Sequence, residues 1–192
     1  MTTLPLQSLR CHPATPAGVV HSIEVRIDVA SDGALTVHYC LRGDIDRLRI
    51  PALIAAPDAQ LRTDLLWQHT CFEAFIRVAG QSAYREFNFS PSGQWACYAF
   101  SHYRQRIDDP GCIDAPVISS RHTAGRLELE AILPATCLPP TPARQVWQLG
   151  LSTVVEARDT VDGSHSYWAL THPAPQPDFH HIDGFALDIT CP

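Results

Sequence analysis

Alternation of apolar and polar side chains is the feature of this sequence that most constrains its fold. In IEVRIDV, residues 23–29, every second side chain is apolar, and LTVHYCLR, residues 35–42, repeats the pattern. A period of two residues is typical of a strand with one buried face. The turn-forming pair Asp32 and Gly33 stands between these runs, so the sequence predicts a hairpin.

Similar runs recur along the rest of the chain and favour an all-β fold. Sixteen prolines separate short elements, because proline removes a backbone donor and breaks long helices. Many short strands at roughly even spacing predict an antiparallel β-sandwich or jelly roll, formed by one domain over residues 1–192. Helix is expected to be scarce, with at most a turn or two at 57–66 and 134–138. The further predicted strands are 71–78, 84–89, 94–103, 126–132, 146–155, 165–170 and 185–190.

Charge and cysteine content limit the classes of partner and the compartment. Fourteen arginines, with no lysine, face 20 acidic residues, which gives a net charge of −6 without a concentrated basic patch. Nucleic acid is therefore not expected as a partner. With 45% hydrophobic and 18% charged residues, the composition is typical of a globular chain that does not span a membrane, so no membrane is expected as a partner either. The first residues lack the apolar run of a signal peptide, which favours a cytoplasmic location. Seven single cysteines without a CxxC pair predict buried thiols, with no disulfide framework and no zinc ribbon.

Two neighbouring predicted strands carry polar groups and rings on one face. In CFEAFIRV, Glu73 and Phe75 point away from the apolar row, and YREFNF likewise presents Tyr84, Glu86 and Asn88 on one side. If these strands pair as a hairpin, the five side chains share a face. Such a face suits a polyhydroxylated ligand, because hydroxyls need donors and acceptors while sugar C–H faces stack on rings. The alternative is a solvated surface on which the carboxylates pair with arginines, namely Arg77, Arg85 or Arg104.

A second dense stretch is SYWALTHPAPQPDFHH, near the carboxyl end. His172, Asp178, His180 and His181 lie close together there, and imidazoles with a carboxylate can bind zinc. Their spacing matches no zinc signature, and loop histidines usually bond the backbone or cap a turn. We therefore expect no metal, and we expect this loop to anchor the final strand.

Four motifs in order resemble a known family over residues 20 to 189. LWQHTCFEAFI, YREFNFSPSGQWACYAF, LSTVVEARDTVDGSHSYWAL and HPAPQPDFHHIDGFAL are similar to the DOMON-like family, in particular its MurB-like bacterial branch, which is related to family 9 carbohydrate-binding modules. The resemblance implies a β-sandwich whose relatives bind haem or sugars. Haem-binding relatives use methionine with histidine or lysine as axial ligands. This chain has only Met1 and no lysine, so a bis-histidine site is the remaining haem option.

The sugar-binding relatives clamp a terminal sugar between two tryptophans, and the resemblance assigns that role here to Trp67 and Trp168. Polar neighbours would then bond the sugar hydroxyls. Of the other two tryptophans, Trp147 lies in an alternating apolar run and is expected in the core. The predicted ligand-binding residues are Trp67, Gln68, His69, Glu73, Tyr84, Glu86, Asn88 and Trp168.

The preferred function is a non-catalytic domain that binds a small carbohydrate or sugar-like polar ligand without a cofactor. One alternative is an interaction domain whose aromatic face is covered by a second copy of the chain, as a homodimer. Another is an enzyme, either a hydrolase with Glu73 and Glu86 as acid and base or a metal-dependent enzyme that uses the histidine-rich loop. The last is haem binding.

Overall fold

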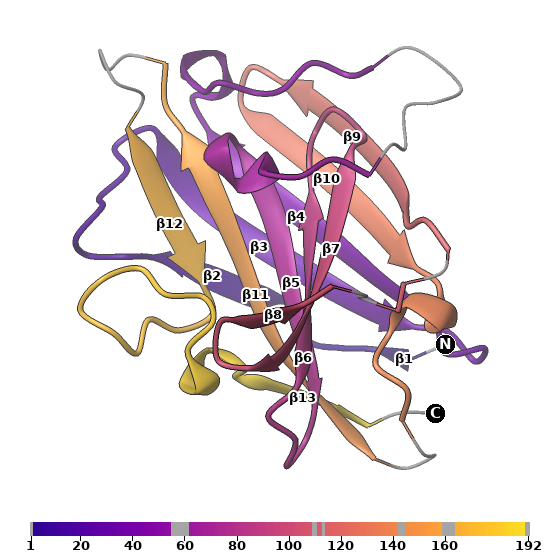
Figure 1. Cartoon of the computed structure of the whole chain (residues 1–192). Helices are drawn as coiled ribbons and strands as arrows, with labels where there is room; N and C mark the ends of the chain where they lie inside the picture. The colour runs from indigo at the N-terminus through magenta and orange to yellow at the C-terminus, as the bar shows by residue number, and fades with distance from the viewer. Residues whose placement is uncertain are drawn as a thin grey trace.

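The structure, a computed structural model, describes residues 2–54, 62–108, 111–112, 114–141, 145–158 and 164–190. Strands dominate this part of the chain, and its only helical elements are four single 3₁₀ turns (Figure 1). None of these turns is long and apolar enough to span a bilayer. The strands are β1 (Thr2–Thr3), β2 (Gln7–Cys11), β3 (Val20–Val29), β4 (Leu35–Gly43), β5 (Cys71–Val78), β6 (Tyr84–Phe89), β7 (Trp95–His102), β8 (Gln105–Ile107), β9 (Val117–Thr123), β10 (Arg126–Leu133), β11 (Val146–Glu156), β12 (His165–Ala169) and β13 (Leu187–Thr190).

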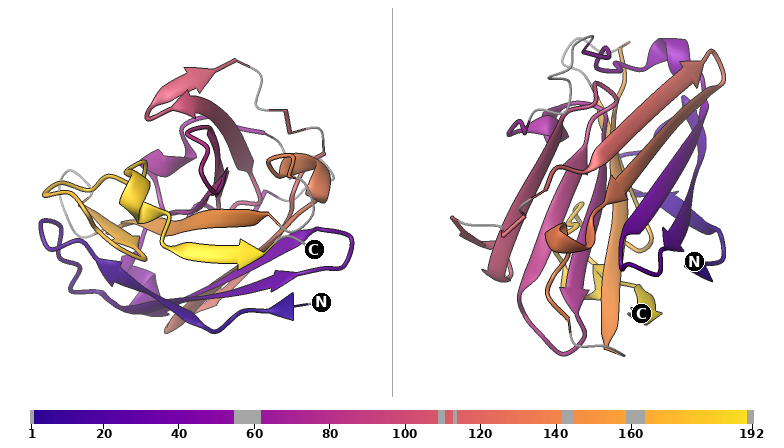
Figure 2. Two further views of the ribbon diagram at one scale, coloured as in Figure 1. Left: turned by 90° about the horizontal axis from the view of Figure 1, so that it is seen from below. Right: turned by 90° about the vertical axis from the view of Figure 1, so that its right-hand side faces the viewer.

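The strands form two antiparallel layers that pack face to face (Figure 2). The first sheet has the order β2-β3-β4-β10-β9, with β1 paired to β3. The second has the order β8-β7-β6-β5-β11-β12, with β13 paired to β11. Strand β2 bonds to β3 in the first sheet and to β12 in the second, so the layers are joined along one edge. This arrangement confirms the predicted antiparallel β-sandwich.

The core lies between the layers because each sheet turns one set of alternate side chains inward. In the predicted hairpin β3–β4, Val25 pairs with Tyr39 and Ile27 with Val37, and all four are buried. The second sheet contributes Phe72 and its alternate neighbours to the same cluster. Burying a side chain of this size contributes about 1.5–3 kcal/mol. Trp147 belongs to this cluster, as predicted.

Four strands were not predicted from the sequence. The short β1 and β8 and the peripheral β2 carry little alternation, and β9 reads VISSRHT, which is largely polar because the strand lies at the exposed end of its sheet. The predicted turn at 134–138 is the 3₁₀ turn η3 (Ala135–Cys137). Of the other predicted turn, 57–61 lie outside the described residues, and its end overlaps the 3₁₀ turn η2 (Leu66–Gln68). The remaining turns are η1 (Ile45–Arg47) and η4 (Ile182–Gly184).

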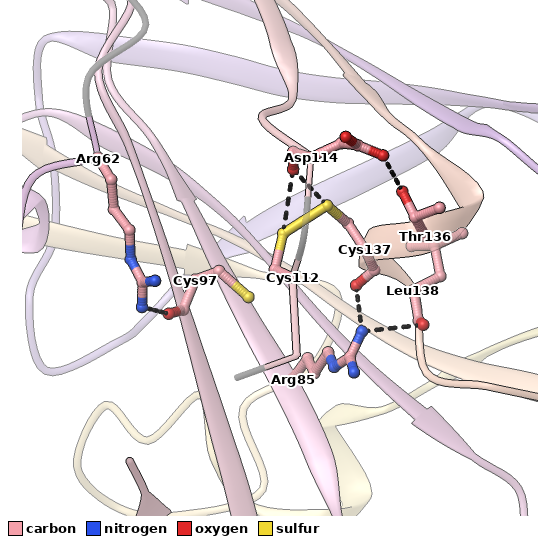
Figure 3. The surroundings of a disulfide bond; sticks show 8 residues. All are labelled: Arg62, Arg85, Cys97, Cys112, Asp114, Thr136, Cys137 and Leu138. Atoms are coloured by element: carbon pink, nitrogen blue, oxygen red, sulfur yellow. Dashed lines mark hydrogen bonds between the residues drawn. A yellow bond between two sulfur atoms is a disulfide. The ribbon is translucent and has the colours of Figure 1, made fainter. Parts of the chain in front are cut away.

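One disulfide corrects the expectation that the cysteines stay as thiols. Cys112 and Cys137 are bonded, with their Cα atoms 4.2 Å apart (Figure 3). Cys112 precedes β9, and Cys137 lies in η3 between β10 and β11. The pairing was not visible in the sequence because 25 positions separate the two residues and only the fold brings them together. Cys11, Cys40, Cys71 and Cys97 are free, and Cys191 lies outside the described residues.

Candidate functional site

The outer face of the second sheet carries the polar and aromatic groups that the sequence singled out. Strands β5 and β6 pair as predicted, with Glu73 opposite Asn88 and Phe75 opposite Glu86. The period of two therefore places these side chains together on the face that points away from the core. The predicted hairpin and its shared face are confirmed.

A cavity of about 690 Å³ opens on this face. Its floor contains Glu73, Phe75 and Glu86. The walls come from η2 and the residues before it, from β7, β8 and the turn between them, from β11 and β12, and from the loop after β12. The complete lining is Asp64, Leu65, Trp67, Glu73, Phe75, Glu86, Tyr98, Phe100, Arg104, Arg106, Val154, Tyr167, Pro177, Phe179 and His180.

Aromatic rings form a small second core under the loop 171–185. Tyr84 stacks on Phe100 with centroids 4.7 Å apart and planes 9° from parallel. Phe75 meets Phe179 and Phe185 edge to face at 6.4 Å and 6.3 Å. These offset and edge contacts are the geometries that aromatic pairs prefer. They hold the loop on the sheet, so that Phe179 and His180 form one wall of the cavity.

The carboxyl groups of Glu73 and Glu86 lie in an apolar floor with few compensating contacts. Burial raises the pKa of Glu73 well above its ordinary value, and the nearby Glu86 raises it further. Burial also raises the pKa of Glu86, to about 7, against the opposing effects of Asn88, Arg104 and Arg106. Ser152 Oγ donates to Glu73 Oε2 at 3.4 Å, and Asn88 Nδ2 donates to Glu86 Oε1 at 2.8 Å. Near neutral pH these carboxyl groups therefore supply both hydrogen-bond donors and acceptors.

A hydrogen-bonded chain fixes His180 beside Glu86. The backbone N–H of Arg104 donates to Tyr84 Oη at 3.1 Å, and Tyr84 Oη lies 2.8 Å from His180 Nδ1. Because Tyr84 Oη accepts the Arg104 N–H, its own proton is available for Nδ1, which leaves the imidazole proton on Nε2. That nitrogen lies 3.6 Å from Glu86 Oε2. Burial lowers the pKa of His180 to about 4, so the ring is neutral at pH 7.

Backbone strain is concentrated at this cavity. Leu65 and Arg104 have φ values of 63° and 56°, and they are the only non-glycine residues with positive φ in the described part of the chain. Both line the cavity. Such conformations cost of order 1–3 kcal/mol each and cluster at functional sites. Tyr98 fixes one of them, because its Oη accepts the Leu65 N–H at 3.4 Å and donates to Asp64 Oδ1 at 2.8 Å.

Seven of the eight predicted ligand-binding residues fall into three groups in and around the cavity. Trp67, Glu73 and Glu86 line it, and Trp67 is 46% exposed. Tyr84 and Asn88 lie directly behind the lining and hold His180 and Glu86. Gln68 and His69 are exposed beyond the cavity, where His69 Nδ1 lies 2.7 Å from Glu156 Oε2. We therefore leave Gln68 and His69 out of the candidate site.

Trp168 lies in the sandwich core, so the expected clamp of two tryptophans does not form at this cavity. Its ring belongs to the main apolar cluster, and its Nε1 donates to Ser166 Oγ at 3.1 Å. In β12 the neighbouring Tyr167 points to the opposite face and lines the cavity. A displacement of one position along a strand exchanges its faces, which is why motif position alone selected the wrong ring. Trp67 therefore shares the lining of the cavity with tyrosine and phenylalanine rings.

The sequence reasoning did not select several lining residues. Asp64 and Arg106 lie in segments without a recognisable pattern. Phe179 lies in a proline-rich loop, where no strand alternation indicates which side chains are buried. Tyr98 had a usable signal, since QWACYAF alternates and Tyr98 falls on the face opposite the core residue Cys97. These distant segments were not predictable, because only the folded chain brings β8, which pairs with β7, and the 171–185 loop to the same cavity as β5 and β6.

The alternative in which Glu73 and Glu86 pair with arginines on a solvated surface is not what the structure shows. Among the described residues, no arginine forms an ion pair with Glu73 or Glu86. The guanidinium of Arg77 lies over Phe185 at 5.0 Å, and Arg85 donates to the carbonyls of Cys137 and Leu138. Arg104 pairs with Asp178, with Nη2 2.9 Å from Oδ1.

The four residues of the histidine-rich loop take separate structural roles. His172 Nε2 lies 2.7 Å from the Arg10 carbonyl oxygen, and His181 Nδ1 accepts the Asp183 N–H that begins η4. Asp178 holds Arg104, and His180 belongs to the chain with Tyr84. Within the described ranges, no cluster of three or more histidine, cysteine, aspartate or glutamate side chains has the geometry of a metal site.

Comparisons with known proteins support the architecture. No protein-family model matches the chain, and no curated protein matches it. Among solved structures, it resembles a putative carbohydrate-binding protein from Bacteroides uniformis, with a TM-score of 0.67 and 13% identity over 97% of this chain and 85% of that one. It also resembles a family 9 carbohydrate-binding module from Caldicellulosiruptor kristjanssonii in complex with cellotriose, with a TM-score of 0.52 and 12% identity over 86% and 72%. The fold is thus like that of family 9 carbohydrate-binding modules.

Proposed function

We propose that this protein binds a small carbohydrate, without chemical conversion, in the cavity on the outer face of the second sheet. The observation that carries the proposal is the cavity itself, where an exposed tryptophan and several other rings surround two buried carboxyl groups. A module with the same kind of fold has been solved in complex with cellotriose. The similarity of fold supports a carbohydrate as the class of ligand. The residues of the cavity support this cavity as the binding site.

The size and chemistry of the cavity suit a monosaccharide or disaccharide. A volume of about 690 Å³ falls within the range of small-molecule sites. Trp67, Tyr167 and Phe179 offer ring faces to sugar C–H groups. Glu73 and Glu86 offer carboxyl oxygens to hydroxyls from a floor that is already organised by Ser152 and Asn88. A rigid floor lowers the entropic cost of ordering a ligand.

The four sequence motifs also support a proposal about the family to which the chain belongs. We place the chain in the DOMON-like family, in the MurB-like branch that is related to family 9 modules. The four motifs quoted above and the sandwich fold support this placement. Matching those motifs across an alignment of homologues, position by position, is the test, and a family pattern that leaves out Glu73, Glu86 and Trp67 would count against it.

Titration calorimetry and tryptophan fluorescence test the proposed function. We expect saturable binding of at least one member of a panel of monosaccharides and disaccharides. Trp67→Ala should weaken that binding by about tenfold or more, because truncating an aromatic anchor of a binding site costs about 2 kcal/mol or more. Ile132→Ala is the matched control, since Ile132 is 36% exposed on the outer face of the other sheet. Absence of binding across the panel, or an equal loss in both variants, would refute the proposal.

A further inference from the structure

Two arginines stand at one rim of the cavity, above the carboxyl floor. Arg104 is in the turn that leads into β8, and Arg106 is in β8 itself, the short strand at the end of the second sheet. The cations of the cavity are thus held together at one rim, while Glu73 and Glu86 lie in the floor. Both guanidinium groups lower the pKa of Glu86, because a nearby positive charge favours its carboxylate form.

The two arginines differ in whether an acidic side chain neutralises their charge. Asp178 accepts from Arg104 Nη2 at 2.9 Å and also from Tyr103 Oη at 2.8 Å, so Arg104 is held in a closed ion pair. Arg106 has no such partner among the described residues. Its guanidinium lies on the face of Tyr98, with Cζ 4.2 Å from the ring centroid.

Stacking on Tyr98 orients the Arg106 guanidinium without using its hydrogen-bond donors. A cation–π contact is made to the face of the aromatic ring and uses none of the guanidinium N–H groups as donors to an oxygen acceptor. The Tyr98 ring is itself fixed, because its hydroxyl donates to Asp64 and accepts from the Leu65 backbone. Arg106 therefore presents an oriented and unneutralised fork of donors at the mouth of the cavity, which is the geometry that recognises a carboxylate or a phosphate.

Asp64 is the acidic residue of the lining that bonds to Tyr98, the ring under Arg106. Its Oδ1 is occupied by the Tyr98 hydroxyl, and it forms no ion pair with Arg106. His180 is neutral at pH 7, and Asp178 is already paired. The other two acidic residues of the lining, Glu73 and Glu86, lie in the floor, where burial favours their protonated, neutral forms. The rim at Arg106 is thus left with a cation that a ligand can neutralise.

We infer that the ligand of this cavity is an acidic saccharide, whose hydroxyls meet Glu73 and Glu86 while its anionic group is bound by Arg106 on its Tyr98 platform. The inference rests on the proposed function and narrows its ligand class. A uronic acid and a sugar phosphate share this chemistry, since each places an anion beside a polyhydroxylated ring. The two sources are separated by experiment.

Calorimetric titration of matched sugar pairs tests the inference. The probes are glucuronate against glucose, galacturonate against galactose, and glucose 6-phosphate against glucose, with inorganic phosphate and acetate as free anions. We expect at least one charged sugar to bind about tenfold or more tightly than its neutral partner, because a hydrogen bond to a charged group contributes roughly 1.5–3 kcal/mol. A preference confined to the uronates or to the phosphate identifies the anionic group.

Three variants assign the preference to one side chain. In Arg106→Gln the ratio of charged to neutral affinity should fall close to one, and in Arg106→Lys it should be intermediate, because lysine keeps the charge but not the planar fork. Arg42→Gln should keep the full ratio, since it removes the same charge from an exposed position on the first sheet. A thermal melt of each variant confirms folding.

The outcomes separate this inference from the proposed function. A ratio near one in the unmodified protein, with neutral sugars bound through Trp67, overturns the acidic saccharide and leaves carbohydrate binding intact. A ratio that Arg106→Gln and Arg42→Gln change equally also overturns it. Free phosphate or acetate bound as tightly as the charged sugars would show that the rim recognises an anion alone. Failure of every saccharide refutes both proposals.

Discussion

Glu86 shows how a single side chain can make the sandwich sensitive to pH. Its pKa is about 7 in the folded protein, against 4.5 ordinarily, because burial disfavours the charged form. Below pH 4.5 both the folded and the unfolded states hold the proton. Between 4.5 and 7 the folded state keeps a proton that the unfolded state releases, so the stability that the raised pKa contributes is lost as pH rises.

Replacing Glu86 by glutamine should remove this loss. We expect Glu86→Gln to raise the free energy of unfolding at pH 8 by up to about 3 kcal/mol relative to the unmodified protein, with the difference closing toward pH 4.5. His180 acts in the opposite direction, because its lowered pKa costs stability as pH falls from 6.5 to about 4, but it is present in both proteins and cancels. Urea unfolding at pH 4.5, 6 and 8 measures the difference.

Glu130→Gln is the control for this pH series. Glu130 is half-buried on the outer face of the first sheet, so its replacement should shift stability little and without the same pH trend. A gap between Glu86→Gln and the unmodified protein that stays constant from pH 4.5 to 8 would contradict the raised pKa of Glu86.

Tyr84 gives a second prediction, because one hydroxyl bridges two segments of the cavity wall. Tyr84→Phe keeps the stacked ring but removes the partner of the Arg104 N–H and of His180 Nδ1. Leaving such groups without a partner costs about 1–3 kcal/mol. We expect that loss in urea unfolding, together with faster hydrogen exchange at the Arg104 amide.

Tyr167→Phe is the matched control for Tyr84→Phe. The Tyr167 hydroxyl makes no hydrogen bond with the described residues, so its removal should change the free energy of unfolding by only a few tenths of a kcal/mol. Equal effects of the two substitutions would argue against the bridging role of Tyr84.

At the scale of elements, alternation predicted most of the sandwich. The limits of β5 and β6 agree with the predicted 71–78 and 84–89, because each strand places an alternate row of apolar side chains in the sandwich core. Trp168 shows the limit of matching by motif, since it was placed in the site by its position in SYWAL while the pleat of β12 turns it into the core. Arg106 and Phe179 reach the cavity through long-range pairing and loop packing, which no local pattern encodes.

An element-scale prediction concerns the irregular start of the β3–β4 hairpin. The register shifts there between Val20 and Ser22, and Val20 pairs with Gly43. A Cβ added at Gly43 would lie 2.3 Å from the Val19 carbonyl oxygen and 3.0 Å from Val20 Cα. Gly43→Ala therefore forces the backbone apart, and we expect a loss of about 1–3 kcal/mol in the free energy of unfolding.

Gly18→Ala is the comparison for Gly43→Ala, because an added Cβ at Gly18 meets no atom within 4 Å. Thermal unfolding of the two variants side by side gives the measurement. If Gly43→Ala melts no lower than Gly18→Ala, the close approach of the two chains at this bulge is not a constraint on the fold.

At the scale of the whole molecule, the disulfide joins two of the connections that cross between the layers. Cys112 lies on the path from β8 in the second sheet to β9 in the first, and Cys137 lies on the return path from β10 to β11 (Figure 3). The bridge closes a loop of 25 residues. In the chain-entropy model such a cross-link stabilises the folded state by about 3.5 kcal/mol through the unfolded state.

Reduction of this bridge is therefore expected to lower the urea midpoint of purified protein. Cys112→Ser with Cys137→Ser should lower it similarly and abolish the response to reductant, because the free thiols Cys11, Cys40, Cys71 and Cys97 cross-link nothing. A cytoplasmic location, which the sequence predicts, would keep most thiols reduced, so the oxidised and reduced forms are compared in vitro. An unmodified protein whose midpoint is the same with and without reductant would show that the layers are held by the core alone.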